Sequence, residues 1–531
     1  MTVFVLVAGA FTGAHVWQET AARLAASGAE VHSVALTGLD GSRRGTGVRI
    51  DLETHIADVI AAIDSVDAAA GGDIVLVGHG YGIHPVVGAA DRRAERIARI
   101  VCLDTGMPKD GIPALAAVPD PDLRAQVAER AGSEAGTEGA DGARAPKSRA
   151  EWQRWGSTAG VSDTAMDRLV ALAAPQPTAT LLQPLRLTGA VTAVPTTGVL
   201  CTRNGASIAL VQQLVSLGDP DLRFLADPRV SFFELATGHW PMLSCPTELA
   251  VALLRAAAGE GQRLKPADDT QPPPHLRPFP LDVPELPRER RGNVDLYLPP
   301  DAEGPRPAVV FVHGGPVPAG VRPTPRDWPT LMGYARLAAA QGAVGVTLDH
   351  RLHDVADYER AAEDVAAAVE LARADPRVDA DRIALWFFSA GGLIMADWLR
   401  ARPVWLRCVA ATYPILAPMP NWGLAGSGFL PAEAVAHAGN LPVVLTRVGL
   451  EMPEIAVTVE EFLAAAKDAG TDVEVVDVPH GRHGFETLAP VEEWRDAVHR
   501  AMGSVLARLT PTAFAYPPTA ERGRGSNPAA R

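Results

Sequence analysis

Short apolar runs typical of buried strands alternate with helical patterns along most of this chain. Residues 358–374 are an example of the helical type, with Ala, Val and Leu recurring at helical spacing. Strands that alternate with helices favour mainly parallel sheets. We therefore predict an α/β fold with two sheets, each mostly parallel and flanked by helices. The strand-like runs are residues 3–7, 30–35, 73–77, 100–103, 196–201 and 230–235 in the first half, and 308–312, 343–348, 382–388, 409–413, 442–447 and 473–478 in the second.

A proline-rich segment divides this alternation near residue 270. It contains Pro272-Pro273-Pro274 and a charged run at residues 288–291, a composition that suits a semi-rigid linker. The 531 residues would make three or four domains of about 150 residues, but single α/β domains often reach about 250. We therefore predict two tandem domains. The predicted divisions are 1–257 for the first domain, with a lid at about 107–190 and a flexible loop at 131–148, then 258–292 for the linker, 293–510 for the second domain and 511–531 for a disordered tail.

Composition and charge argue against several classes of function. The chain carries 48 basic and 62 acidic side chains, a net charge of −14, and no basic patch stands out, so we expect no nucleic-acid partner. No apolar run approaches the about 18 residues of a membrane span, and the N-terminus lacks the basic start of a secretory signal, so we expect a cytoplasmic protein that does not bind membranes. Four widely spaced cysteines fit neither a disulfide framework nor a zinc pattern and are expected to be buried thiols: Cys102, Cys201, Cys245 and Cys408.

The second half contains a serine at a predicted strand-to-helix turn. The segment IALWFFSAGG places Ser389 directly after a buried strand and before the small residues Ala390 and Gly391. Such a turn exposes the serine oxygen above the sheet and aims the following amide at a developing oxyanion. The glycine usual two positions before the serine is Phe387 here. Taken alone, the segment suits a helix-capping serine equally well.

Three further segments of the second half favour a catalytic role for this serine. A predicted strand ends in His313-Gly314-Gly315-Pro316, and because Pro316 has no N–H, the second oxyanion donor beside Ala390 should be the amide of Gly315. Another strand is followed by Glu451, and the last strand by a segment that contains His483. The order serine, acid, histidine is that of α/β-hydrolases.

On these segments the second half resembles α/β-hydrolases of the dienelactone-hydrolase-like serine esterase group. The resemblance covers about residues 290–510 and is carried by VVFVHGGP, DRIALWFFSAGG, LPVVLTRVGLEMPEI and PHGRHGFETL. It implies Ser389 as nucleophile, His483 as general base and Glu451 as the acid that orients the histidine, although aspartate is commoner at that position. His480 is the rival base, and the histidine directly before Gly-Phe is the one that matches the group. Glu454 is a weaker rival for the acid.

The first half resembles a different α/β-hydrolase branch, the group of plant esterases and hydroxynitrile lyases. The resemblance covers about residues 1–257 and is carried by FVLVAGAFTGAHVWQETAARLAASG, DIVLVGHGYGIHPVVGAADR and LATGHWPMLSCPTELAVAL. Its departures are informative. Gly80 stands at the serine position, the early His-Gly turn is Ala8-Gly9, and the acid position falls at Asn204. Glycine has no nucleophilic side chain, so we expect no acyl-enzyme in this half.

His239 is the one triad residue that the first half keeps. One interpretation is that this half has lost its catalytic activity and serves as a scaffold, a dimerisation surface or a substrate-presenting module. The alternative is a pocket in which His239, oriented by Asp104 at the end of the strand after the turn, acts as an acid or base in a non-hydrolytic step such as cyclisation, lyase or decarboxylase chemistry. Trp152 and Trp155 would lie in the lid over that pocket, although such a pair is more often core packing. The glycines around Gly80 do not have dinucleotide-loop spacing.

The sequence thus predicts a serine hydrolase that cleaves an ester, thioester or lactone of a small organic substrate. The alternatives are a non-hydrolytic enzyme or pseudoenzyme defined by the first pocket, and an interaction scaffold, so homo-oligomerisation stays open. We expect no cofactor and no metal. His350 and His353 have no third ligand nearby in sequence, which favours a loop or supporting role for both.

Overall fold

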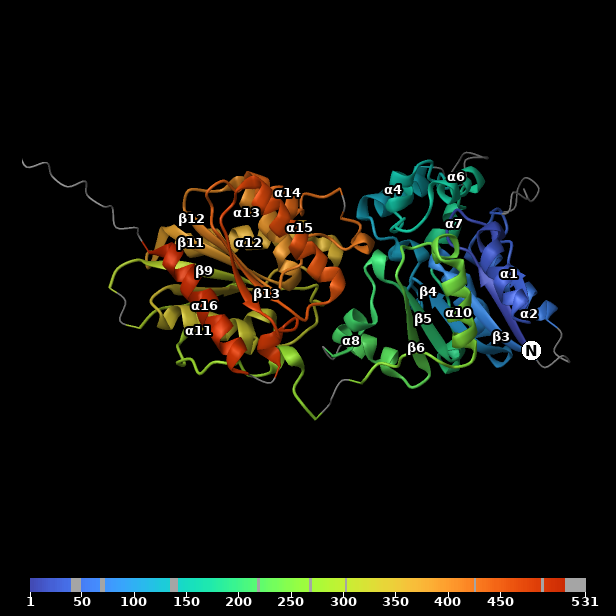
Figure 1. Ribbon diagram of the computed structural model, residues 1–531, viewed down its shortest axis with the longest axis horizontal. Coiled ribbons are helices and arrows are strands. Elements are labelled where there is room, and N and C mark those ends of the chain that lie inside the picture. The colour runs from blue at the N-terminus through green and yellow to red at the C-terminus, as the bar shows by residue number, and fades with distance from the viewer. Residues whose placement is uncertain are drawn as a thin grey trace, which may run out of the picture.

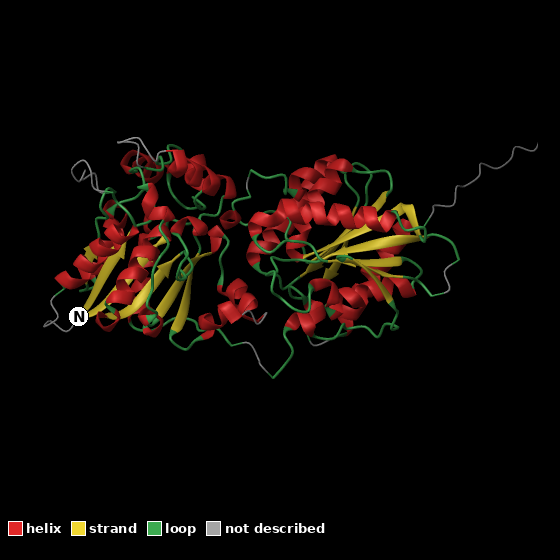
Figure 2. Ribbon diagram, turned by 180° about the vertical axis from the view of Figure 1, so that it is seen from behind, coloured by secondary structure: helices red, strands yellow, loops and turns green. Residues whose placement is uncertain are grey.

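The computed structural model describes residues 1–39, 49–66, 72–133, 142–216, 220–266, 270–300, 303–424, 426–488 and 491–510. Its strands form two separate sheets, one in each half of the chain (Figure 1). Helices cover both faces of each sheet (Figure 2). The chain has the α/β-hydrolase fold, which confirms the predicted fold class.

The first sheet has six strands in the order β2-β1-β3-β4-β5-β6, all parallel. Its central strands are buried on both faces, since residues 74–79 of β3 are all buried, and this matches their continuous apolar sequence. The carboxyl ends of all six strands therefore meet at one edge. The strands are β1 Thr2–Val7, β2 Glu30–Ser33, β3 Asp73–His79, β4 Ile97–Leu103, β5 Thr196–Cys201 and β6 Val230–Leu235.

The second sheet has eight strands in the order β14-β13-β12-β11-β9-β10-β8-β7. The six strands from β14 to β10 are parallel, and β8 and β7 are antiparallel additions at one edge. The sheet is thus mixed, with a parallel main part. The strands are β7 Arg288–Arg291, β8 Val294–Tyr297, β9 Arg306–Val312, β10 Val344–Leu348, β11 Val378–Phe388, β12 Leu406–Thr412, β13 Val443–Val448 and β14 Val473–Val478.

Some of the helices begin or end at local sequence signals. In α2 the Asp51 side chain accepts from the Thr54 amide in a capping box, and α15 ends at a left-handed Gly470. Helices α4, α6 and α7 lie together at one end of the first sheet (Figure 1). The helices are α1 Gln18–Ala26, α2 Leu52–Ser65, α3 Ile83–Arg92, α4 Pro121–Ser133, α5 Arg149–Gln153, α6 Asp163–Leu172, α7 Thr178–Leu182, α8 Ile208–Ser216, α9 Pro241–Ser244, α10 Pro246–Ala257, α11 Pro329–Ala340, α12 Tyr358–Arg373, α13 Met395–Ala401, α14 Pro431–Ala434, α15 Pro453–Ala469 and α16 Glu492–Leu509.

The predicted linker contains more structure than its composition indicates. Arg288–Arg291 forms β7, so the charged run belongs to the second sheet rather than to a connection. Its arginines pair with acidic side chains of that half, as Arg290 does with Asp295 at 3.0 Å. Phe279 also packs against the core of the second half. The tail at 511–531 lies outside the described residues, as does the centre of the predicted loop at 131–148.

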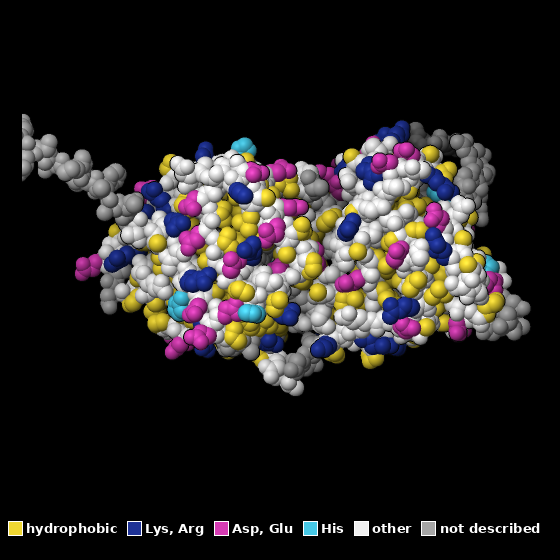
Figure 3. Space-filling view, viewed as in Figure 1, with side chains coloured by type: hydrophobic (Ala, Val, Ile, Leu, Met, Phe, Trp, Pro, Cys, Tyr) yellow, Lys and Arg dark blue, Asp and Glu magenta, His cyan; other side chains and the backbone are white. Residues whose placement is uncertain are grey.

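The surface and the helices bear on the expected partners. On the face drawn in Figure 3, basic and acidic side chains are interspersed rather than gathered in single-sign patches. Within the described part of the chain, no helix combines the length and the apolar character needed to cross a membrane.

Candidate active site

Ser389 lies at a sharp turn at the carboxyl end of the second sheet. It follows β11 and opens the short helix η12, Ser389–Ile394, with a φ of +50° that is unusual for a residue other than glycine. Glycines let the chain pass closely here: a Cβ on Gly314 would lie 2.8 Å from the Ser389 Cβ. Phe387, at the position where glycine is usual, is fully buried in the core, and the turn forms with it.

The structure brings Ser389, His483 and Glu451 together in one hydrogen-bonded chain. Ser389 Oγ lies 2.7 Å from His483 Nε2, and His483 Nδ1 lies 2.8 Å from Glu451 Oε2. The histidine and glutamate side chains are 8% and 5% exposed. Glu451 follows β13 and His483 follows β14, so three parallel strands deliver the three side chains to the same edge. The second oxygen of Glu451 accepts from the Met452 amide at 2.8 Å, which fixes the carboxylate.

The two predicted oxyanion donors lie in two turns, Ala390 directly after the serine and Gly315 after β9. Ala390 is in the first turn of η12, where helix amides have no internal acceptor. Gly315 lies in the turn after β9, and no hydrogen bond of its amide to another described residue is found. Two bonds hold the serine turn in place: Tyr358 donates its hydroxyl to the Ala390 carbonyl at 3.0 Å, and the Ile415 amide donates to the Ser389 carbonyl at 2.9 Å.

The other candidate residues do not take part in the hydrogen bonds that link Ser389, His483 and Glu451. His480 is 83% exposed and bonds to Glu493. Glu454 lies in the first turn of α15 and accepts a hydrogen bond from Ser207 of the first half. His353 is exposed and bonds to the Val317 carbonyl at 2.9 Å.

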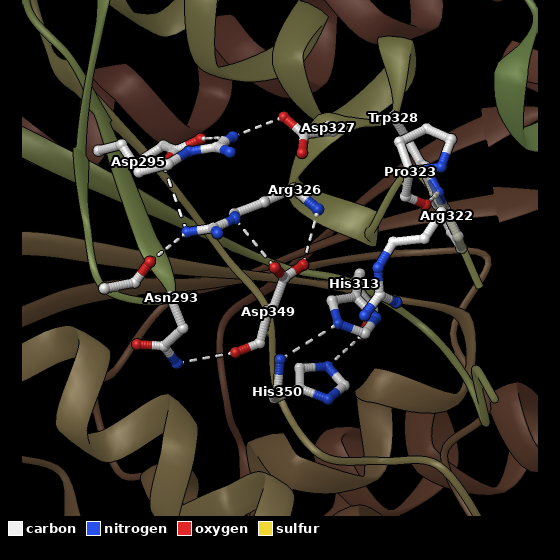
Figure 4. A network of polar contacts seen from close by, with 12 residues as sticks. Asn293, Asp295, His313, Arg322, Pro323, Arg326, Asp327, Trp328, Asp349 and His350 are labelled. Carbon is white, nitrogen blue, oxygen red and sulfur yellow. Dashed lines mark hydrogen bonds and ion pairs between the residues drawn. The ribbon is translucent and has the colours of Figure 1, made fainter. Parts of the chain in front are cut away.

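Two stacked histidines, His313 directly after β9 and His350, lie next to each other close to the Gly314-Gly315 turn (Figure 4). The rings of His313 and His350 are parallel within 10°, with centroids 3.6 Å apart. His350 Nε2 also bonds to the His313 carbonyl at 3.0 Å. Burial lowers the pKa of His350 to about 4 and that of His313 well below its usual range, so both rings are neutral at pH 7 and can stack without repulsion.

Asp349, next to this pair, connects the turn to the edge of the sheet (Figure 4). Its carboxylate accepts from the Arg326 amide at 3.0 Å and pairs with the guanidinium of the same residue at 2.9 Å. Its carbonyl accepts from the Asn293 side chain at 2.9 Å. Arg326 in turn lies 3.5 Å from the buried Asp295 of β8. The position of His350 is therefore fixed by a network that begins at β7 and β8.

Glu486 is a buried residue of this region that the sequence did not single out. It follows His483 by three positions, is 0% exposed, and accepts a hydrogen bond from the Tyr334 hydroxyl at 2.7 Å. Burial raises the pKa of its carboxyl to about 7. Tyr413 lies next to it, and the Tyr413 ring centroid is 4.8 Å from that of His483. The sequence carries no signal for this burial, because Tyr334 comes from the distant helix α11.

The first half has a related arrangement without the serine. Gly80 follows β3 with a φ of +48°. His239 Nδ1 lies 2.7 Å from Asp104 Oδ2, and the Asp104 side chain is only 2% exposed. Asp104 also accepts from the Asn204 side chain at 2.7 Å and from the Cys201 amide at 3.0 Å. The structure thus brings Gly80, His239 and Asp104 together, and Asn204 holds the carboxylate rather than the histidine.

A cavity of about 400 Å³ opens beside this second group. Gly80, Asp104 and His239 line it. Its aromatic wall includes Phe11 and Trp155, whose ring centroids are 4.6 Å apart, and Trp152 and Trp240, at 5.5 Å. Trp152 and Trp155 come from the predicted lid region, Trp152 in α5, and they combine core packing with a wall of the cavity.

The second half also contributes to this cavity. Asn421, in the short helix η13 (Pro420–Trp422), is one of the lining residues. Its side-chain oxygen lies 2.8 Å from the position that a Cβ on Gly205 would take. The cavity wall is therefore built from both halves.

Within the described part of the chain, no cluster of three or more His, Cys, Asp or Glu side chains is arranged to hold a metal ion. The thiols of Cys102, Cys201 and Cys408 are buried, as expected, whereas Cys245 is partly exposed.

Comparison with known proteins agrees with this architecture. Residues 4–253 match the model of the alpha/beta hydrolase family, and residues 294–396 match that of BD-FAE. A carbendazim hydrolyzing esterase of Nocardioides sp. (strain SG-4G) is 37% identical over 129 residues, which are 24% of this chain and 52% of that protein. The chain thus spans about half the length of this curated relative.

Solved structures of similar fold align with somewhat less than half of the chain. An extracellular alpha/beta-hydrolase from a Paenibacillus species has a TM-score of 0.37 and 20% identity over 48% of this chain and 99% of its own. A methylesterase from Arabidopsis has a TM-score of 0.36 and 20% identity over 49% of this chain and 99% of its own.

Proposed function

We propose that this protein is a serine hydrolase that cleaves an ester, thioester or lactone of a small organic substrate through an acyl-enzyme on Ser389. The observation that carries the proposal is the unbroken chain Ser389 Oγ–His483 Nε2, 2.7 Å, and His483 Nδ1–Glu451 Oε2, 2.8 Å. A serine hydroxyl is a weak nucleophile until a base within hydrogen-bond distance takes its proton. A helix-capping serine would have no need of a buried histidine and carboxylate.

The chemistry follows from the geometry. His483 takes the Ser389 proton as Oγ bonds to the substrate carbonyl carbon, and the carboxylate of Glu451 stabilises the imidazolium that forms. The tetrahedral oxyanion accepts hydrogen bonds from the amides of Gly315 and Ala390. His483 then gives its proton to the leaving alcohol or thiol. A water molecule, activated by the same histidine, releases the acid and restores the serine.

Three kinds of support lie outside the triad itself. The match of residues 294–396 to BD-FAE covers both the Gly315 turn and the Ser389 turn. The similarity to an esterase is in keeping with ester hydrolysis. The separate sheets are in keeping with two domains, of which the second carries the triad and includes β7, and so begins before the predicted residue 293.

The test is labelling with a fluorophosphonate probe, which reacts with activated serines. We expect the wild type to be labelled and Ser389→Ala to be unlabelled. His480→Ala serves as the matched control, because His480 is the exposed neighbour on the same loop, and it should be labelled like the wild type. An unlabelled wild type would reject the proposal.

A further inference from the structure

The turn after β3 in the first half has the backbone shape of the turn that carries Ser389. Gly80 has a φ of +48° and Ser389 one of +50°. Two residues later each turn passes close to the neighbouring strand: a Cβ on Gly82 would lie 2.5 Å from the Ala8 carbonyl oxygen, and one on Gly391 would meet the equivalent strand at 2.6 Å. The first half thus keeps the form of a nucleophile turn without a nucleophilic side chain on it.

The imidazole of His239 faces this turn. Its Nδ1 is bonded to Asp104, and no hydrogen bond to Nε2 is found among the described residues. A Cβ built on Gly80 would lie 3.2 Å from Nε2, and apart from the adjacent residues only atoms of His239 would come within 4 Å of it. The space beside Gly80 is therefore bordered by a basic nitrogen and is otherwise open toward the cavity.

Two backbone amides of the first half correspond to the oxyanion donors of the second. Tyr81 lies in the first turn of η3, Gly80–Gly82, as Ala390 does in η12. Ala10 follows β1 at the position that Gly315 holds after β9. Ala10 and Tyr81 both line the cavity, and no hydrogen bond of either amide to another described residue is found outside the helices and strands.

We propose that this cavity is a second hydrolytic site, in which His239 activates a water molecule in place of a serine. His239 Nε2 takes one proton from the water as the water oxygen bonds to the ester carbonyl carbon, and the oxyanion accepts from the amides of Ala10 and Tyr81. The bond between the carbonyl carbon and the oxygen of the alcohol then breaks, and the leaving oxygen takes the proton from His239. The products are the acid and the alcohol, and no covalent bond to the protein forms at any stage.

The position of the open space favours water as the reactant over proton removal from a carbon of the substrate. It lies between the base and the turn, where a serine oxygen would stand in a hydrolase of this fold. Water is held in such places when two or more polar groups are within reach, and here the imidazole and the turn amides supply them. Asp104, held by Asn204 and the Cys201 amide, fixes the ring so that Nε2 points at this space.

The cavity wall indicates a small, uncharged ester with an aromatic group. Seven Phe, Tyr and Trp side chains are among the described residues that line it, and their rings offer faces and edges for stacking. Among the described residues that line the cavity none is Lys or Arg, so a carboxylate or phosphate would enter without a partner of opposite charge. Burial lowers the pKa of His84 to about 4 and that of His79 well below its usual range, so neither supplies positive charge at pH 7.

The first test measures hydrolysis of 4-nitrophenyl acetate by full-length Ser389→Ala, which lacks the nucleophile proposed for the second half. We expect it to hydrolyse the ester at least about tenfold faster than Ser389→Ala/His239→Ala, with no initial burst. Ser389→Ala/His480→Ala is the control and should match its parent. Equal rates with and without His239 would overturn this proposal and leave the one for Ser389 untouched. An unlabelled wild type with His239-dependent hydrolysis would reject Ser389 and support this site.

The second test restores the missing side chain. Ser389→Ala/Gly80→Ser places a hydroxyl beside His239 Nε2 at a φ that the native Ser389 also adopts. We expect this variant to gain fluorophosphonate labelling at residue 80, whereas Ser389→Ala alone stays unlabelled. Absence of labelling in a variant whose circular dichroism matches the parent would show that His239 cannot activate an oxygen at this position, and the proposal would fail.

Discussion

The two histidine sites of this molecule receive their carboxylate from different strands. In the second half Glu451 follows β13, two strands in chain order beyond the strand that carries the serine turn, and contacts His483. In the first half Asp104 follows β4, one strand beyond the turn, and contacts His239. The residue that follows β5, in the place that corresponds to Glu451, is Asn204. An acid can therefore reach the histidine from either strand.

The end of the strand after the turn explains why both arrangements work. Asp104 has a φ of +48° and Tyr413, at the same place in the second half, one of +36°. Each side chain contacts the histidine of its own site, Asp104 by a hydrogen bond and Tyr413 by its ring. Glu451 and Tyr413 both contact His483, whereas Asn204 is linked to His239 only through Asp104. The residue after the strand that follows the turn can therefore be either the acid or an aromatic neighbour of the histidine.

Removal of Ser389 or His483 should have the largest effect. We expect Ser389→Ala and His483→Ala each to lower kcat for ester hydrolysis by about 10⁶-fold, and the double variant to lose little more, because the two groups act as a unit. Steady-state kinetics on an aryl ester provides the measurement. If the fold-losses in kcat of the two single variants multiplied in the double variant, Ser389 and His483 would not act as a unit. The second half would then differ less from the first, which lacks a serine at this position.

Glu451→Gln should cost less, about 10⁴-fold in kcat. The amide keeps the size of the side chain and loses the charge that stabilises the imidazolium. Glu454→Gln is the matched control, since Glu454 lies in the same segment and bonds to Ser207 instead. If the control lost as much activity as Glu451→Gln, the assignment of the acid to the residue after β13 would be wrong.

Glu486 predicts a pH-dependent difference in stability. Burial raises its pKa to about 7 from an unfolded value of 4.5, so the folded state binds the proton more tightly. The stabilisation that comes from this bound proton is fully present below pH about 4.5 and is lost as the pH rises through about 7. The loss lowers the free energy of unfolding by about 3 kcal/mol. We expect Glu486→Gln to remove this loss between pH 4.5 and 8, as measured by urea unfolding at both pH values. Glu461→Gln, at an exposed position of α15, should follow the wild type.

Asn204→Asp should have the smallest effect and should act on stability. It would place a second carboxylate beside Asp104, which now accepts from the Asn204 amide at 2.7 Å. Loss of that hydrogen bond and repulsion between like charges should lower the free energy of unfolding by about 1–2 kcal/mol at pH 8, and less at pH 4. Thermal unfolding at the two pH values is the measurement. A variant as stable as the wild type at pH 8 would mean that the two acid positions can be filled together.

The sequence was sufficient for the parallel strands of both sheets, because most of them are buried apolar runs, but it did not predict the antiparallel edge strands β7 and β8. It also identified the side chains that the structure brings together around Ser389, since each lies within five residues of the carboxyl end of a predicted strand. Other features depend on contacts between distant segments. The charged run at residues 288–291 has the composition of a linker, and pairing with β8 makes it a strand. The burial of Glu486 depends on Tyr334, 152 residues away, and the role of Asn204 on the carboxylate that it holds.

The contact of Asn421 with the first cavity has a consequence for the evolution of the chain. A residue of the second half that lines a cavity of the first cannot change without altering that cavity. The segment that carries it also bonds to the serine turn, through the Ile415 amide. Selection on either site therefore acts on this segment. We expect substitutions in the two halves to be correlated, unlike those in two separate proteins.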